Sequence, residues 1–108
     1  MSIQSLKPIF EAENIAIVGA SKDPGKAAHQ IQKRMMKQGF KGRLFPVNPR
    51  EKEILGLPCY PSVADIKERM DLIVICVPAK AVLSVMRQVA DREDIKGAVI
   101  ISAGFAET

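Results

Sequence analysis

The sequence predicts an α/β fold with a parallel sheet of about five strands and helices on both faces. Short runs of β-branched, apolar residues alternate with longer segments that have a helical period. The two clearest runs, 14–18 and 71–77, are almost free of charge, as expected for strands buried on both faces of a parallel sheet. Turns that contain glycine or proline follow both runs. This pattern is typical of a Rossmann-like, doubly wound architecture.

The composition is that of a single globular domain. Of the 108 residues, 47% are apolar and 26% are charged, which is enough for one buried core. No apolar run is long enough for a membrane helix, and no signal peptide is visible. Cys59 and Cys76 are too few for a disulfide framework, and neither has the nearby Cys or His of a zinc site. We therefore expect a reducing, cytoplasmic environment and no membrane partner.

The first strand, helix and second strand follow from the pattern of the first half. "NIAIV" (14–18) is the strand, and residues 25–38 continue with a helical period and a mostly basic outer face. The inner face of this helix carries Ala28, Ile31 and Met35. "RLFPV" (43–47) predicts the second strand. Pro46 favours the sheet edge or the strand end, because it cannot donate a backbone hydrogen bond.

The middle of the chain predicts less regular structure. Residues 48–58 are expected to form a loop, and 58–60 could add a very short third strand. Ser62 is a favourable N-cap for a helix that begins within "PSVADIKERM". Asp65 stands three residues later, where a capping box places its second member.

The second half predicts two more strands around a second long helix. "DLIVICV" (71–77) is the strand, and Pro78 ends it. The inner stripe of the helix over 80–91 consists of Val82, Val85, Met86 and Val89. "GAVIIS" (97–102) is the last strand. The sequence stops where a further helix would normally begin, so we expect 1–108 to be the N-terminal fragment of a longer chain.

Ligands of open α/β sheets bind at the carboxyl ends of the strands, which makes the loops there the candidate site. In the first loop, Gly19 allows a sharp turn, and the small residues after it let a ligand approach the backbone. Gly25 opens a helix whose free N–H groups can hold a phosphate. Hydroxyl and positive charge come from Ser21, Lys22 and Lys26. The loop is neither G-x-G-x-x-G nor a P-loop, and a plain turn without ligand is the alternative.

The second loop distinguishes between nucleotide ligands. An NAD site needs an acidic residue at the end of the second strand to hold the ribose hydroxyls. Here Asn48, Pro49 and Arg50 follow that strand, which suits a phosphorylated ribose better. The pattern points to the 2′-phosphate of NADP or the 3′-phosphate of coenzyme A, and a solvated arginine is the alternative. Two further loops, 77–80 and 102–104, add small or apolar residues at the same edge.

Five ordered blocks carry a resemblance to a known family: "IAIVGASKDPGK", "GRLFPVNPR", "GLPCYPSVADI", "DLIVICVPAKAV" and "VIISAGFAE". Together they resemble the N-terminal CoA-binding domain of NDP-forming (ADP-forming) acyl-CoA synthetases, relatives of the succinyl-CoA synthetase alpha subunit. The resemblance implies that coenzyme A binds across the four loops. The residues that it places at CoA are Gly19, Ala20, Ser21, Lys22, Gly25, Lys26, Asn48, Pro49, Arg50, Val77, Pro78, Ser102, Ala103 and Gly104.

The resemblance also implies that catalysis takes place elsewhere. Such synthetases pass phosphate through a histidine in the next domain and bind ATP in an ATP-grasp domain, so these domains or subunits are the implied partners. The only histidine here, His29, matches no such motif, and we expect it to lie on the helix surface without a role. No catalytic and no metal-binding residue is therefore expected in this chain.

Other functions remain open from the sequence. The same kind of domain opens some protein lysine acetyltransferases and occurs in small stand-alone modules that bind CoA or NAD(P) for regulation. Sixteen basic against twelve acidic residues give a net charge of +4, which suits an anionic partner or an ordinary solvated surface. Nucleic-acid binding has little support, because there is one tyrosine, no tryptophan and no base-stacking motif.

Overall fold

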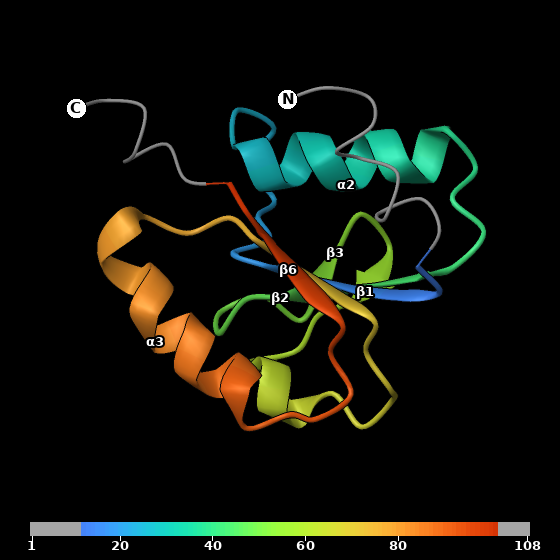
Figure 1. Ribbon diagram of the computed structural model, residues 1–108. Helices are drawn as coiled ribbons and strands as arrows, with labels where there is room; N and C mark the ends of the chain where they lie inside the picture. Colours follow the sequence, from blue (N-terminus) through green and yellow to red (C-terminus); the bar gives the residue numbers. More distant parts are fainter. Residues whose placement is uncertain (1–11, 102–108) are drawn as a thin grey trace.

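The computed structural model describes residues 12–101 and consists of a parallel sheet between two helices (Figure 1). The strands in sheet order are β2 (Arg43–Val47), β1 (Asn14–Val18), β5 (Leu72–Ile75) and β6 (Gly97–Ile100). All neighbouring strands are parallel. The helices are α2 (Ala27–Lys37), between β1 and β2, and α3 (Ala79–Ala90), between β5 and β6. The predicted Rossmann-like α/β fold is confirmed, with helix and strand bounds within a few residues of those expected.

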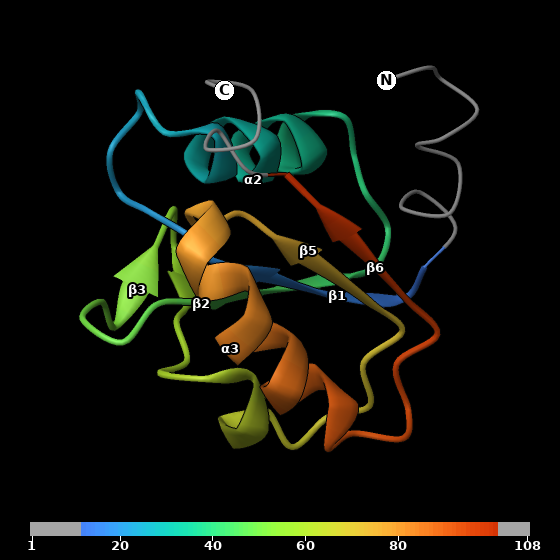
Figure 2. The same ribbon diagram turned by 60° about the vertical axis from the view of Figure 1, so that its left-hand side comes forward.

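The alternation of side chains along the central strands creates two cores. Successive residues of a strand point to opposite faces, so Ala16 and Ile73 pack toward α3, and Ile17 and Val74 pack toward α2. Both central strands are buried on both faces, which explains why their sequences are continuous apolar runs. Figure 2 shows α2 and α3 on opposite faces of the sheet.

The strand order creates a switch point at the centre of the sheet. From β1 the chain moves outward to β2, and it then returns to the other side of β1 to form β5. The connections after β1 and β5 therefore lead to helices on opposite faces of the sheet. The two loops diverge from each other at the carboxyl ends of these strands. Pro46 lies in β2, one of the two edge strands, as its lack of a donor predicted.

The segment between β2 and β5 differs from the prediction. Residues 48–58 contain a small antiparallel hairpin of β3 (Glu53–Ile54) and β4 (Leu57–Pro58). The expected third strand is reduced to one parallel bridge between Val47 and Tyr60. These strands are too short to show an alternating pattern in the sequence.

The helix expected after Ser62 is a single 3-10 turn, η1 (Val63–Asp65). The hydroxyl of Ser62 donates to the Asp65 carboxylate (3.0 Å) and does not cap the backbone. The guanidinium of Arg92 explains the early end, because it donates hydrogen bonds to the carbonyls of Val63 and Ile66. A distant side chain thus holds this segment in a non-helical course.

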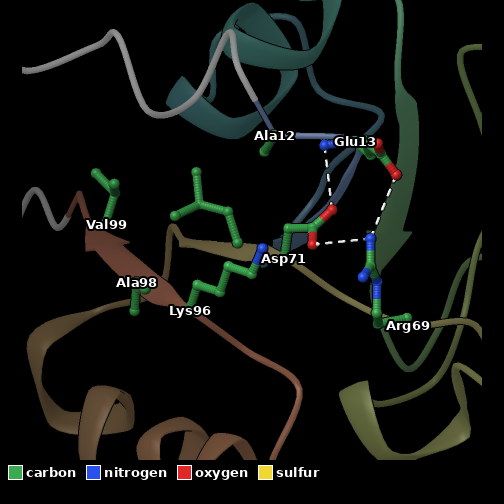
Figure 3. Close-up of a pocket in the computed structure, with 9 residues that line it drawn as sticks. Ala12, Glu13, Arg69, Asp71, Lys96, Ala98 and Val99 are labelled. Carbon is green, nitrogen blue, oxygen red and sulfur yellow. Dashed lines mark hydrogen bonds and ion pairs between the residues drawn. The ribbon is translucent and has the colours of Figure 1, made fainter.

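At the amino end of the sheet, Asp71 joins the starts of three strands. Its Oδ2 accepts the backbone N–H groups of Glu13 (3.1 Å) and Asn14 (3.0 Å), and its Oδ1 lies 3.4 Å from Nη2 of Arg69. Its backbone oxygen accepts the N–H of Lys96. These groups border a cavity of about 570 Å³ (Figure 3), in which the Asp71 carboxylate is already engaged with Arg69 and the backbone.

Asp71→Asn is expected to lower the free energy of unfolding by about 1–2 kcal/mol at pH 7. The hydrogen bond from the Asn14 N–H, followed by that from Glu13 and the charge of Arg69, holds the pKa of Asp71 below its usual value. A lowered folded-state pKa contributes stability above the unfolded pKa of about 3.9, and this contribution is lost as pH falls through the folded-state pKa. Urea unfolding between about pH 7 and pH 2 should show the gap between wild type and variant closing. A gap that stays constant would contradict this role.

Candidate functional site

A cleft of about 620 Å³ opens at the carboxyl ends of the central strands. It lies beside the switch point, where open α/β sheets bind their ligands. Its walls come from the loop after β1, the start of α2, the loop after β2, the loop after β5 and the end of β6. The lining residues are Gly19, Ala20, Ser21, Lys26, Ala27, Ala28, Asn48, Arg50, Cys76, Val77, Pro78 and Ile101.

The structure brings most of the predicted site residues together in this cleft. Lys22, Gly25 and Pro49 belong to the same loops but do not line it. Ser102, Ala103 and Gly104 lie outside the described residues, directly after Ile101, which does line the cleft.

The sequence interpretation missed four lining residues: Ala27, Ala28, Cys76 and Ile101. The alanines had a usable signal, because small residues at a helix start allow a ligand to approach the N–H groups. Cys76 stands in the apolar run 71–77, which gives no sign of a ligand-facing side chain. It is half-buried, packs against the core on one side and also lines the cleft.

Gly19 sets the course of the first loop. Its φ is +87°, and an added Cβ would overlap the carbonyl oxygen of Cys76 at the end of β5. Its N–H donates to the carbonyl of Val47 (3.0 Å), as does the N–H of Ala20 (3.2 Å). Only glycine allows this loop to lie so close to both neighbouring strands.

Asn48 connects the first and second loops. Its Nδ2 donates to the carbonyl of Ala20 (2.8 Å), and its Oδ1 accepts the N–H of Arg50 (2.7 Å). The sequence predicted that Asn48 faces a ligand. In the structure its amide also holds the carbonyl of Ala20 and the backbone of Arg50 in fixed positions.

The cations of the two loops differ in their surroundings. Nζ of Lys22 forms an ion pair with Oε2 of Glu51 (3.0 Å) across the two loops. Within residues 12–101, Lys26 and Arg50 form no ion pair. Both line the cleft, so their charges are available to an anionic ligand there.

The start of α2 adds positive potential to the same wall. Its N-cap, Lys26, makes no side-chain capping hydrogen bond, and the first turn contains no acidic residue. The first N–H groups of an α-helix have no intrahelical partner, and they carry the positive end of its dipole. Since Ala27 and Ala28 line the cleft, these groups can reach a phosphate without steric obstruction.

The loop after β5 contributes apolar surface to the cleft. Burial raises the pKa of the Cys76 thiol to about 11, so at neutral pH it is an uncharged, weakly polar group. Burial also raises the pKa of Cys59, whose Sγ lies 3.7 Å from the carbonyl oxygen of Asn48. Val77 and Pro78 continue the wall beyond Cys76.

His29 is not the exposed side chain that the sequence suggested. It is 8% exposed, and its Nδ1 lies 2.8 Å from the carbonyl oxygen of Ser21 in the first loop. It belongs to the first turn of α2. The expectation was wrong because the loop before α2 contacts this side of the helix, which the helical pattern alone does not reveal.

The described residues contain neither a helix suited to cross a bilayer nor a metal-binding group of side chains. Between Ala12 and Ile101, no helix has the length and apolar character that a bilayer span requires. In the same range, no group of three or more His, Cys, Asp or Glu side chains is placed to hold a metal ion.

Comparison with known proteins identifies the family to which this chain belongs. The model of the CoA binding domain family matches residues 13–108. The chain is 43% identical to acetate–CoA ligase [ADP-forming] II of Archaeoglobus fulgidus over 106 residues, which are 98% of this chain and 16% of that protein. It is also 43% identical to the acetate–CoA ligase [ADP-forming] of Methanocaldococcus jannaschii, over 94% of this chain and 14% of that protein.

Among solved structures, the dinucleotide forming acetyl-coenzyme A synthetase 1 of Ca. Korarchaeum cryptofilum, in complex with phosphate and ADP, matches with a TM-score of 0.84. Its sequence is 43% identical over 94% of this chain and 22% of that one. The chain thus spans less than a quarter of the length of these relatives. It belongs to the CoA-binding domain family, and it matches a segment of ADP-forming acyl-CoA ligases.

Proposed function

We propose that this domain binds coenzyme A in the cleft at the carboxyl ends of β1, β2 and β5. The single observation that carries the proposal is the convergence of the uncapped start of α2 with Arg50 in one cleft. CoA carries a pyrophosphate and a separate 3′-phosphate, so it needs two cationic regions. The helix start and Lys26 form one region, and Arg50 forms the other.

The shape of the cleft supports the same ligand. Gly19, Ala20, Ala27 and Ala28 leave the backbone accessible to phosphate oxygens. Val77 and Pro78 offer apolar surface to the adenine or to the pantetheine arm. Within this proposal, Ser102, Ala103 and Gly104 continue the site along the pantetheine arm, and Lys22, Gly25 and Pro49 support it from the rims of the loops.

For the whole protein we propose the reaction of an ADP-forming acyl-CoA synthetase, in which an acid, CoA and ATP give acyl-CoA, ADP and phosphate. The relatives that are named ADP-forming ligases support this proposal. The present domain would hold the nucleotide end of CoA and present its thiol to an acyl phosphate formed on other domains, so its contribution would be positional. The two free thiols support a reducing compartment such as the cytoplasm.

Amide NMR shifts during a CoA titration test the proposed site. The expected shifts cluster at Gly19–Lys22, Ala27–His29, Asn48, Arg50 and Val77. Shifts concentrated at Arg69 and Lys96, beside the cavity at the other end of the sheet, would contradict the proposal. NADP is the matched control ligand, since it also carries a phosphorylated ribose. Larger shifts with NADP than with CoA would favour a dinucleotide-binding module instead.

A further inference from the structure

Two side chains fix consecutive carbonyl groups of the first loop. Nδ2 of Asn48 donates to the oxygen of Ala20, and Nδ1 of His29 contacts the oxygen of Ser21. In a trans peptide, the C=O of one residue and the N–H of the next point in opposite directions. Fixing these two carbonyls therefore also fixes the N–H groups of Ser21 and Lys22.

The fixed N–H groups are available to a ligand. Within residues 12–101, the N–H groups of Ser21 and Lys22 have no hydrogen-bond partner. The N–H of Asp23, in contrast, donates to Oγ of Ser21, and the N–H of Gly25 donates to Oδ1 of Asp23. Two successive N–H groups without a partner, next to a helix start, are donors of the kind that bind phosphate.

The contact of His29 defines the proton on its ring. A carbonyl oxygen can only accept, so the 2.8 Å contact with Ser21 requires the proton on Nδ1. The ring is buried in the first turn of α2, so the donor is held by the helix and not by a mobile side chain. Because α2 also provides Ala27 and Ala28 to the cleft, His29 couples the loop donors to the helix donors.

We propose that His29 is a positioning residue for phosphate binding in this cleft. Its Nδ1–H holds the Ser21 carbonyl and thereby fixes the peptide group between Ser21, which lines the cleft, and Lys22 at its rim, so that this part of the loop is preorganised for a phosphate group of CoA. This inference rests on the proposed binding of CoA. His29 does not touch the ligand and acts only through the loop that it anchors.

Two amide substitutions separate positioning from packing. In His29→Asn, the side-chain Nδ2 takes the place of Nδ1 and can still donate to Ser21. In His29→Gln, the amide nitrogen takes the place of Nε2 and cannot. Both variants lose the imidazole ring, so a packing role would affect them alike. We expect CoA binding by His29→Asn within about threefold of wild type and by His29→Gln roughly tenfold weaker, as for one lost hydrogen bond.

Calorimetry measures the binding, and urea unfolding of the same variants shows whether their stabilities match. Equal losses of affinity in both variants, or none in His29→Gln, would overturn the proposal. If wild type itself does not bind CoA, the proposed function is wrong, and CoA cannot be the ligand that His29 helps to bind. Amide NMR then tests the hydrogen bond from His29 to the Ser21 carbonyl by itself. The Ser21 and Lys22 signals should stay near wild type in His29→Asn and move in His29→Gln. Identical shifts in both variants would contradict the role of this hydrogen bond.

Discussion

Gly19→Ala is expected to lower the free energy of unfolding by about 3–5 kcal/mol, which is a large part of the stability of a domain this size. The backbone at Gly19 has a φ of +87°, which costs an L-residue about 1–2 kcal/mol. The new Cβ would also overlap the backbone oxygen of Cys76 at the end of β5. Relief requires the loop to move away from the sheet, which breaks the hydrogen bonds of Gly19 and Ala20 to Val47.

Gly56→Ala is the matched control. Gly56 has a similar φ of +82°, but no atom lies within 4 Å of its virtual Cβ. Its substitution should therefore cost only the backbone term of about 1–2 kcal/mol. Urea unfolding followed by circular dichroism compares the two variants. Equal losses would mean that the close approach of the first loop to β5 contributes nothing to stability.

Arg92→Ala is expected to lower the free energy of unfolding by about 3–5 kcal/mol. Only 14% of the Arg92 side chain is exposed, and its guanidinium forms a two-point pair with Asp94. It also donates to the carbonyls of Val63 (2.9 Å), Ile66 (2.7 Å) and Glu68 (2.8 Å). Its removal would leave the carbonyls of Ile66 and Glu68 without this donor, and the Val63 carbonyl and Asp94 carboxylate with only their backbone N–H partners.

The segment around η1 should lose its order first in this variant, because Arg92 holds it against the end of α3. Hydrogen exchange should then be faster at Ile66 and Met70, whose N–H groups bond to Val63 and Asp94. Arg87→Ala, an exposed position on α3, should change the free energy of unfolding by less than about 0.5 kcal/mol. A comparable loss in both variants would show that the Arg92 network makes no specific contribution to the stability of this region.

The parts of the fold that the sequence predicted are those where local pattern and burial agree. The runs at 14–18 and 71–77 are apolar because both faces of β1 and β5 are buried. The region of η1 could not be predicted, because Ser62 has the residue type of a helix cap and the course of the chain is set by Arg92, far along the sequence. The hairpin of β3 and β4 depends on a turn in which Leu55 adopts a φ of 53°, and no sequence motif signals it.

In the candidate site, too, some features followed from the local sequence and others depended on distant contacts. The small residues at Gly19 and Ala20 and the cation at Arg50 mark strand ends that a parallel sheet brings to one edge, so sequence order was enough to group them. The tasks of Asn48 and His29 were not predictable. Each depends on a hydrogen bond between a side chain and a carbonyl of the first loop, and such bonds follow from the packing of α2 and β2 rather than from local pattern.

The central claim is that this cleft binds coenzyme A, with Arg50 facing its 3′-phosphate. Calorimetry with CoA and dephospho-CoA, on wild type and Arg50→Gln, tests it most directly. We expect wild type to bind CoA roughly 10- to 100-fold more tightly than dephospho-CoA, as for one charge-assisted contact. Arg50→Gln should bind both equally, and Arg87→Gln should behave as wild type. Equal affinity of wild type for the two ligands would contradict the role of Arg50, and no binding of either would contradict the central claim.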